Sequence, residues 1–391
     1  MMTNDFAEGI PFARPNIGPE EVEAVAATMR SGWLTSGPGM EAFEAEFRGY
    51  LGAPIEVLAV QSATAGLHLA LEALGIGPGD EVIVPTWTFT ATAEVVRYLG
   101  ATPVIVDVEP DTLNISLGAV EAAITPATKC VIPVHFAGLP VDMRRLRAIS
   151  DRHGLAVVED AAHAFPAGLD GDVVGNCVYS DACVFSFYAT KPLAMGEGGA
   201  VTTRRPDLAK RIRVMRLHGI DRDVFDRFTS GVRSWHYDVV APGYKYNLSD
   251  LHAAIGRVQL RRTAAMHGRR QLIARHYLDA FANLPIQLPA DAPEGSVHAW
   301  HLFVARLLPE AGISRDDVID RMAEAGIGTS VHYRPLHEHS YWRSRLGDID
   351  TSVAFPHASD SAPRVVSLPL SSALTDEDVA RVVATVRGLV S

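Results

Sequence analysis

The sequence predicts an α/β protein with a large, mainly parallel β-sheet between helices, followed by a smaller α+β domain. Three observations lead to this prediction. Short β-branched runs alternate with helical patterns through the first half of the chain, which is typical of a parallel sheet covered on both faces. One long stretch of helical character, residues 247–284, then interrupts the alternation. Beyond it, strand patterns are fewer and more widely spaced.

The first half of the chain supplies the elements of the large domain. Residues 19–31 predict an amphipathic helix, with two glutamates in the first turn and Val22, Val25 and Met29 on one face. The expected strands are 55–60, 81–85, 102–106, 129–134, 156–159, 183–187 and 199–203. The expected helices between them are 63–74, 90–99, 118–123 and 143–153.

The second half predicts the smaller domain. Its expected elements are strands at 299–307 and 328–333 and helices at 316–325 and 376–389. We place the large domain at residues 14–250. The small domain then comprises residues 251–391 together with the N-terminal segment 1–13, and the long helix joins the two domains.

Composition narrows the class of protein. The 391 residues allow two or three domains, and 48% apolar with 21% charged residues is ordinary for a soluble globular chain. The formal net charge of −11 disfavours nucleic-acid or anionic-membrane partners. Three cysteines are too few for a disulfide framework, and no metal-binding spacing is present. Without a long apolar run or a signal-peptide pattern, we expect a cytoplasmic enzyme.

One lysine stands in an unusual setting. Lys191 follows the expected strand at 183–187, and the glycine-rich run Gly196–Gly199 comes shortly after it. Glycines allow a tight turn and a close approach of the backbone to a bulky ligand. A lysine chosen at random is usually a solvated surface residue. Lys191 by itself therefore does not indicate a functional site, and further features of the sequence are needed.

Three further features complete the set. Asp160 ends an expected parallel strand, at the edge where α/β folds bind ligands, although capping a helix is the commoner role of such a residue. Residues 61–66 begin a helix with small residues, and free N–H groups there favour a phosphate. Trp87 and Phe89 lie just past a strand end, where one ring could stack on a planar ligand or simply pack in the core.

An amine, a carboxylate, a phosphate cradle and a stacking ring together indicate a site for pyridoxal phosphate. The amine would form a Schiff base with the cofactor aldehyde. The carboxylate would raise the pKa of the ring nitrogen and keep it protonated. No Gly-x-Gly-x-x-Gly fingerprint follows a strand and no Walker phosphate loop is present, which argues against a dinucleotide or nucleoside triphosphate site.

At this point the sequence resembles the DegT/DnrJ-type nucleotide-sugar aminotransferases, a family of fold-type-I enzymes that depend on pyridoxal phosphate. The resemblance extends over nearly the whole chain. Its motifs are residues 31–38, 77–82, 159–163, 186–191, 196–199 and 243–250. Residues 298–303 and 326–329 are similar to the UDP-4-amino-4-deoxy-L-arabinose aminotransferases within this family. The resemblance implies a sheet of the seven-stranded type.

The resemblance also implies residue roles. Lys191 would form the Schiff base and then move a proton, Asp160 would pair with the ring nitrogen, and His163 would lie near the phenolic oxygen of the ring. The implied cofactor-binding residues are Ala63, Thr64, Phe89, Asp160, His163, Ser186, Lys191 and Asn247, with Trp87 as second choice for the stacking ring. Asn247 would reach the cofactor phosphate of a neighbouring subunit, giving a homodimer with shared active sites.

The expected reaction moves the amino group of L-glutamate to a keto sugar carried on a nucleoside diphosphate. An acidic protein must provide cationic partners for the diphosphate locally, and Lys245 and His332 are preferred over Arg14 and Arg334. In the family that the sequence resembles, a histidine in the place of His163 is typical of members that aminate C-4, so the resemblance implies a dTDP-4-keto-6-deoxyhexose, as used in antibiotic sugars, as the preferred acceptor.

Several alternatives stay open. The acceptor could be a UDP-4-keto-pentose, a 3-keto sugar or a cyclitol ketone. A non-catalytic binding protein is a third class, against which the intact Lys191 and Asp160 argue. His301 is expected to serve packing or hydrogen bonding rather than metal binding, and residues 222–238 form either a flap over the sugar or a surface loop.

Overall fold

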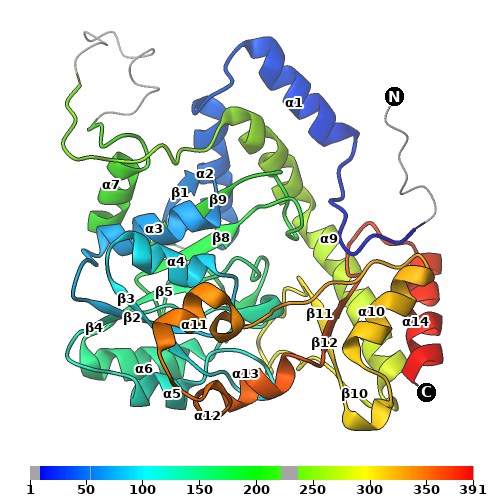
Figure 1. The fold of residues 1–391 in the computed structure, drawn as a ribbon. Coiled ribbons are helices and arrows are strands. Elements are labelled where there is room, and N and C mark those ends of the chain that lie inside the picture. Colours follow the sequence, from blue (N-terminus) through cyan, green and yellow to red (C-terminus); the bar gives the residue numbers. More distant parts are fainter. Residues whose placement is uncertain (1–8, 53, 222–236, 391) are drawn as a thin grey trace.

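A seven-stranded sheet dominates the computed structural model, which describes residues 9–52, 54–221 and 237–390 (Figure 1). Within these residues the strand order is β1-β9-β8-β5-β4-β2-β3. Strand β9 is antiparallel to β1 and β8, and the other neighbours are parallel, so the expected mainly parallel sheet is confirmed. The strands are β1 (Glu56–Val60), β2 (Glu81–Pro85), β3 (Thr102–Val106), β4 (Thr128–Val131), β5 (Ala156–Asp160), β8 (Ala182–Ser186) and β9 (Gly199–Thr203).

Helices cover both faces of this sheet, which explains why its strands are apolar throughout. Leu58 and Val60 of β1 join a buried cluster with three helices, α3 (Ala63–Ala73), α4 (Ala91–Tyr98) and α7 (Pro206–Met215). Val57 and Ala59, which alternate with them, join a second cluster with α2 (Pro38–Leu51). Two further helices, α5 (Leu117–Ala122) and α6 (Met143–His153), pack on Ile83 and Val157.

The start of helix α3 is held close to the sheet. The Ser62 hydroxyl caps this helix by accepting a hydrogen bond from the Ala65 N–H at 3.1 Å. Gly66, in the first turns, faces β8 so closely that an added Cβ would lie 2.7 Å from a methyl carbon of Val184. A glycine is therefore required for the N-terminus of α3 to lie against the ends of β8 and β9.

Helix α9 (Asp250–Phe281) is the long helix expected at 247–284, and it runs from the large sheet into the C-terminal lobe (Figure 1). Its first residue also fixes the position of α2. The buried Asp250 carboxylate accepts hydrogen bonds from the N–H groups of Gly37 (2.8 Å), Gly39 (2.8 Å) and Met40 (2.9 Å). A carboxylate at a helix N-terminus is favourable for its charge as well as for its hydrogen bonds.

The C-terminal lobe is an antiparallel sheet of β10 (Ile286–Gln287), β11 (Phe303–Leu307) and β12 (Val365–Leu368) in the described residues, packed with α10 (Arg315–Glu324) and α14 (Asp376–Val390). The expected strand at 328–333 is wrong. Ser330 makes one bridge to Ser367, and Gly328 bonds instead to Ile10. The strand does not continue because His332 and Tyr333 leave this sheet and line the cavity described below.

Part of the C-terminal half packs on the large sheet. After Tyr333 the chain forms α11 (Ser340–Leu346), α12 (Thr351–Ala354) and α13 (Pro356–Ser361), and Figure 1 shows α11, drawn in orange, next to α4. The Trp342 indole N–H donates to the Thr90 hydroxyl at 3.0 Å. Helix α1 (Pro19–Ser31) has the expected bounds, and Ile10 joins the core of the C-terminal lobe. The division at residue 250 stays a prediction.

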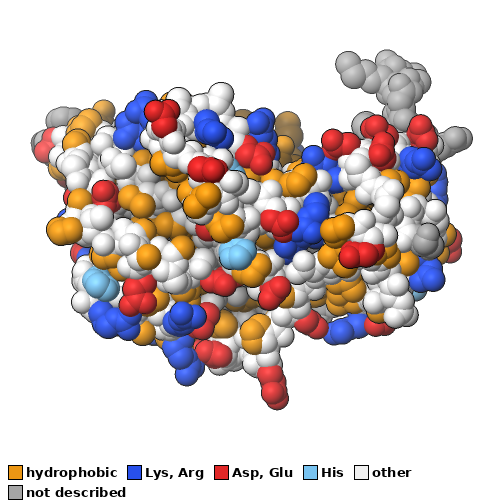
Figure 2. Space-filling model, turned by 60° about the horizontal axis from the view of Figure 1, so that its bottom comes forward, with side chains coloured by type: hydrophobic (Ala, Val, Ile, Leu, Met, Phe, Trp, Pro, Cys, Tyr) orange, Lys and Arg blue, Asp and Glu red, His pale blue; other side chains and the backbone are white. Residues whose placement is uncertain are grey.

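The surface carries both signs of charge. Figure 2 shows Lys and Arg side chains interspersed with Asp and Glu on one face, without a continuous basic stripe among the described side chains there. No helix of the described ranges is long and apolar enough to cross a membrane. Most of the segment 222–238, interpreted above as a flap or a loop, and residues 1–8 of the N-terminal segment lie outside the described residues.

Candidate active site

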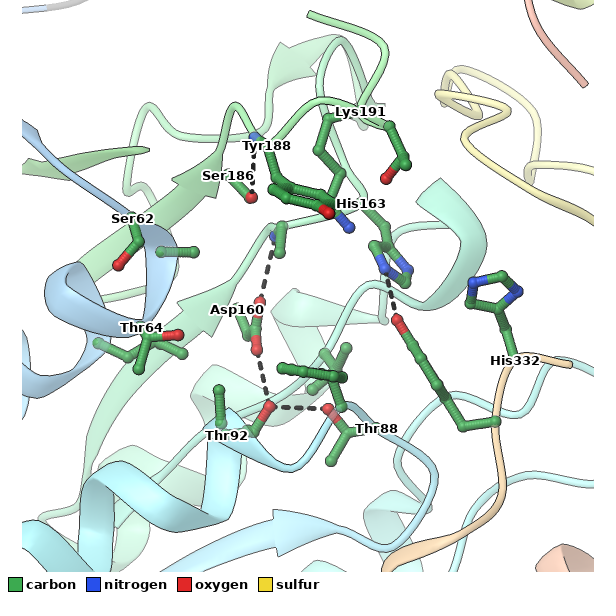
Figure 3. A pocket seen from close by; sticks show the side chains of 18 of the residues that line it. Ser62, Thr64, Thr88, Thr92, Asp160, His163, Ser186, Tyr188, Lys191 and His332 are labelled. Atoms are coloured by element: carbon green, nitrogen blue, oxygen red, sulfur yellow. Dashed lines mark hydrogen bonds between the residues drawn. The ribbon is translucent and has the colours of Figure 1, made fainter. Parts of the chain in front are cut away.

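A cavity of about 390 Å³ opens at the carboxyl ends of the parallel strands (Figure 3). Residues that follow β1, β2, β5 and β8 line it, and the segment around His332 from the C-terminal half closes one side. Eight of the sequence-predicted site residues meet here: Ala63, Thr64, Phe89, Asp160, His163, Ser186, Lys191 and His332. This is the crevice in which α/β folds bind ligands.

Asp160, the last residue of β5, lies at the base of the cavity. Its Oδ2 accepts a hydrogen bond from the Thr92 hydroxyl at 2.8 Å, and its Oδ1 accepts from the Ala162 N–H at 3.1 Å. Burial raises the pKa of Asp160, and the two hydrogen bonds act in the opposite direction. The Thr88 hydroxyl lies 2.7 Å from that of Thr92, so Thr88, Thr92 and Asp160 form a continuous row of hydrogen bonds. Sequence reasoning missed Thr92, because no local pattern links it to Asp160, which lies 68 residues further along the chain.

Lys191 lies in the loop between β8 and β9, where its N–H closes a turn on the Tyr188 carbonyl at 2.9 Å. Its Nζ is 3.4 Å from Nε2 of His301, a residue interpreted from the sequence as a packing histidine. Burial lowers the pKa of the Lys191 amine to about 8, although the nearby Asp160 charge partly opposes this shift. A substantial fraction of the amine is therefore neutral near physiological pH, as a nucleophile requires.

This pKa predicts the pH dependence of chemical labelling at Lys191. The neutral amine is the reactive form, so acetylation at Lys191 should rise about ten-fold per pH unit below 8 and then level off. An unperturbed lysine keeps gaining reactivity beyond pH 10. Competitive labelling of the cofactor-free enzyme, read by mass spectrometry, checks this, with an added short lysine peptide as reference. Parallel pH profiles for Lys191 and the reference peptide would contradict the prediction.

The residues around the start of α3 fit a phosphate group. The first N–H groups of a helix have no partner inside the helix, and those of Ala63 and Thr64 lie at the cavity. Ser186, at the end of β8, adds a hydroxyl. Gly199 lets β9 approach this turn, since a Cβ there would lie 2.8 Å from the Ala63 nitrogen. The donors, the carboxylate and the amine together match the phosphate, ring nitrogen and aldehyde of pyridoxal phosphate.

The two aromatic residues considered for stacking on the cofactor ring differ in their exposure to the cavity. Phe89 lines the cavity and its side chain is 61% exposed. Trp87 is fully buried in a core cluster, with its ring 6.3 Å from that of Phe136, so the second choice for the stacking ring is wrong. The two side chains lie two residues apart in the turn after β2, where the chain is not a regular strand, and only packing decides which one faces the core.

Three imidazoles lie near Lys191, and two of them, His163 and His332, line the cavity. The rings of His163 and His301 are 4.4 Å apart, and Nδ1 of His332 lies 2.9 Å from the Ser367 hydroxyl. Burial lowers the pKa of all three, to about 4 for His332 and well below the usual value for His163 and His301. The rings are therefore neutral at physiological pH. Nε2 of His163 lies 2.9 Å from the hydroxyl of Tyr333, a cavity residue that sequence reasoning missed.

The other predicted ligand residues lie outside the cavity of their own chain. Asn247 borders a groove that shares Ser62 and Glu197 with the cavity, and its amide donates to the Ser36 hydroxyl at 2.5 Å. Lys245 is exposed and bonds to the Asn247 side chain. The two less favoured cations, Arg14 and Arg334, are exposed as well. No cluster of potential metal ligands occurs among the residues that the structure describes.

Comparison with known proteins places this geometry in a family. The model of the DegT/DnrJ/EryC1/StrS aminotransferase family matches residues 15–387. The chain belongs to this family. The expected class of enzyme, an aminotransferase of fold type I, is therefore confirmed. Aminotransferases of this family depend on pyridoxal phosphate, which confirms the expected cofactor.

Individual relatives of this aminotransferase are similar over almost their full length. It is 44% identical over 383 residues to the spore coat polysaccharide biosynthesis protein SpsC of Bacillus subtilis, covering 97% of each chain. The PMP-form of the putative sugar aminotransferase Spr1654 from Streptococcus pneumoniae superposes with a TM-score of 0.89 at 35% identity, covering 97% of this chain and 98% of that one. DesV of S. venezuelae, solved with a ketimine intermediate, gives 0.84 at 37% identity over 94% of each chain.

Proposed function

We propose that this aminotransferase moves the amino group of L-glutamate to a nucleotide-linked 4-keto sugar. The observation on which the proposal rests is the convergence of the Lys191 amine, the Asp160 carboxylate and the start of α3 on one cavity. The similarity to solved sugar aminotransferases supports a sugar as acceptor.

Each residue in the cavity has a distinct task in this proposal. Pyridoxal phosphate, when bound, supplies an aldehyde that carries the amino group and a protonated ring that accepts electrons. Asp160 keeps the ring nitrogen protonated by its negative charge, and Thr92 and Ala162 hold this carboxylate in place. Lys191 would hold the cofactor covalently through its aldehyde, and its neutral amine would accept a proton from the substrate carbon at Nζ. The N–H groups of α3 and the Ser186 hydroxyl hold the phosphate.

We further propose a homodimer with shared active sites. Asn247 and Lys245 lie outside the cavity of their own chain, beside the groove that adjoins it, so a second chain is needed to bring an amide and a cation to the cavity. Helix α1 also leaves Val22 and Met29 exposed on the apolar face expected from the sequence. In a dimer, Lys245 of the second chain would supply the cation for the diphosphate. His332, expected from the sequence as a further cationic partner, is neutral because burial lowers its pKa to about 4, so it would contact the sugar as an uncharged group. Mixing of two inactive variants, described in the Discussion, tests this arrangement.

The family resemblance also indicates the position of amination and the nucleotide. His163 favours amination at C-4, and a dTDP-4-keto-6-deoxyhexose is the preferred acceptor. The aminated product could then be used in an antibiotic. The name of SpsC refers to a coat polysaccharide, which supports use of the aminated sugar in a polysaccharide instead. A UDP-4-keto-pentose, a 3-keto sugar or a cyclitol ketone remains the alternative acceptor.

The two halves of the reaction give a direct test. Purified enzyme mixed with L-glutamate should lose the visible absorbance of its bound cofactor as the amino group is transferred, and the dTDP-4-keto-6-deoxyhexose should restore it. NMR of the product then gives the aminated carbon. Restoration by 2-oxoglutarate but by none of the nucleotide-linked keto sugars would overturn the proposed acceptor class, and amination at C-3 would overturn the position.

A further inference from the structure

Tyr333 ends a chain of hydrogen bonds that begins at the backbone. The N–H of Ala137 donates to Nδ1 of His163 at 3.3 Å, and Nε2 of the same ring lies 2.9 Å from the Tyr333 hydroxyl. His163 itself is 4% exposed, and Tyr333 is half-buried at the cavity wall. Figure 3 shows the bond from His163 as a dashed line on the side of the cavity next to His332.

The backbone N–H of Ala137 determines which group donates and which accepts in each of these hydrogen bonds. A backbone N–H can only donate, so Nδ1 of His163 must carry a lone pair. A neutral imidazole then holds its proton on Nε2 and donates it to the oxygen of Tyr333. The tyrosine hydroxyl cannot donate to His163, because no lone pair is left there. Its own proton has no other acceptor among the described residues and lies at the cavity.

We infer that Tyr333 donates this hydrogen bond to an oxygen of the keto sugar and so positions the acceptor at the cavity. The inference rests on the proposed function and adds a substrate-positioning residue to it. His163 then acts through Tyr333 rather than on the ligand directly, since both of its nitrogens already have partners.

The surroundings favour a sugar oxygen over a carboxylate of glutamate as the acceptor of this bond. The rings nearest to Tyr333 are the neutral imidazoles of His332 and His163, with ring centres 5.0 and 5.9 Å away, and the phenyl rings of Phe136 and Phe89 at 6.1 and 6.4 Å. A carboxylate needs cationic or multiple donors when it is buried, whereas a carbonyl or hydroxyl is satisfied by a single neutral donor. Burial raises the pKa of Tyr333, so the hydroxyl keeps its proton.

The test separates the two half-reactions in the variant Tyr333→Phe, which removes one oxygen atom. The single-turnover rate with dTDP-4-keto-6-deoxyhexose should fall about ten-fold or more, while the rate with L-glutamate stays within about two-fold of the wild type. Binding of the aminated nucleotide sugar, measured by calorimetry, should weaken by a similar factor. The matched control is Tyr277→Phe, because the buried Tyr277 hydroxyl donates to the Pro369 carbonyl at 3.0 Å away from the cavity.

Other results would overturn the inference. Equal losses in both half-reactions would mean that the hydroxyl serves the cofactor, and no loss in either would mean that it contacts no ligand. ¹⁵N NMR of labelled histidine gives an independent reading, since His163 must carry its proton on Nε2 in the wild type. A proton on Nδ1 would refute the direction of the chain. If wild-type enzyme accepts amino groups from glutamate but uses no keto sugar, the proposed function itself fails, and the inference with it.

Discussion

Replacement of Lys191 by alanine should lower the rate of transamination by about ten-thousand-fold or more. No other lysine of the same chain lines the described cavity, and in the proposed dimer Lys245 of the second chain meets the diphosphate rather than the cofactor aldehyde, so no second amine is placed to take over. The fold should persist, because the Lys191 side chain lies at the cavity rather than in a core cluster. Steady-state assays with L-glutamate and the nucleotide-linked sugar measure the loss. Borohydride reduction followed by peptide mapping should locate the cofactor on residue 191 of the wild type.

Two controls sharpen this prediction. Lys129→Ala, an exposed lysine, should be indistinguishable from wild type. Asn247→Asp should be inactive by itself, because the added carboxylate would repel the cofactor phosphate of the neighbouring subunit. Mixing Lys191→Ala with Asn247→Asp chains should then restore about a quarter of wild-type activity, since half of the dimers would be mixed and each would hold one intact site. Full activity of Lys191→Ala, or cofactor fixed to another lysine, would refute the assigned role. If the mixture failed to regain activity, this result would refute the shared active sites but not the role assigned to Lys191.

The second large effect is expected for Asp160→Asn, with a loss of about a hundred- to ten-thousand-fold in both half-reactions. Asparagine keeps the size of the side chain but removes the charge that holds the ring nitrogen protonated, and without that proton the ring is a weaker electron acceptor. The loss should appear in single-turnover rates rather than in cofactor content. The visible absorbance of the bound cofactor should shift as well, since the charge of its ring changes.

A matched control for this variant is Asp107→Asn. Asp107 is also buried and accepts hydrogen bonds from two N–H groups, those of His357 (2.9 Å) and Ala358 (3.1 Å), but it lies outside the cavity. The two substitutions should lower the unfolding temperature similarly, whereas only Asp160→Asn should slow the reaction. An Asp160→Asn enzyme with wild-type rates would refute the pairing with the ring nitrogen.

Local pattern was sufficient for much of the fold. The strands of the large sheet appear as continuous apolar runs because helices bury both of their faces, and a proline followed by glutamates placed the start of α1 correctly. Helix α2 was missed, since a buried Asp250 from a distant segment caps its N-terminus and leaves no cap in its own sequence. The expected strand at 328–333 failed because its residues pair with several different segments.

The candidate site divides in the same way. Ala63, Thr64, Asp160, Ser186 and Lys191 each stand at the end of a strand or the start of a helix, and parallel strands bring such ends to one edge. The choice between Phe89 and Trp87 depended on core packing, which the short turn after β2 does not reveal. The role of Thr92 became visible only in the structure, where its hydroxyl donates a hydrogen bond to Asp160.

By itself, the sequence determined the fold class, because its strands and helices alternate at recognisable spacing, and its resemblance to a known family determined the aminotransferase class and the cofactor. Only the tertiary structure placed His301 beside Lys191 and Tyr333 beside His163, pairs that are 110 and 170 residues apart. The same holds for the direction of the chain from Ala137 to Tyr333, which a backbone N–H fixes. Contacts of this kind arise when the C-terminal half folds back over the large sheet, and short-range patterns carry no information about where a distant segment comes to rest.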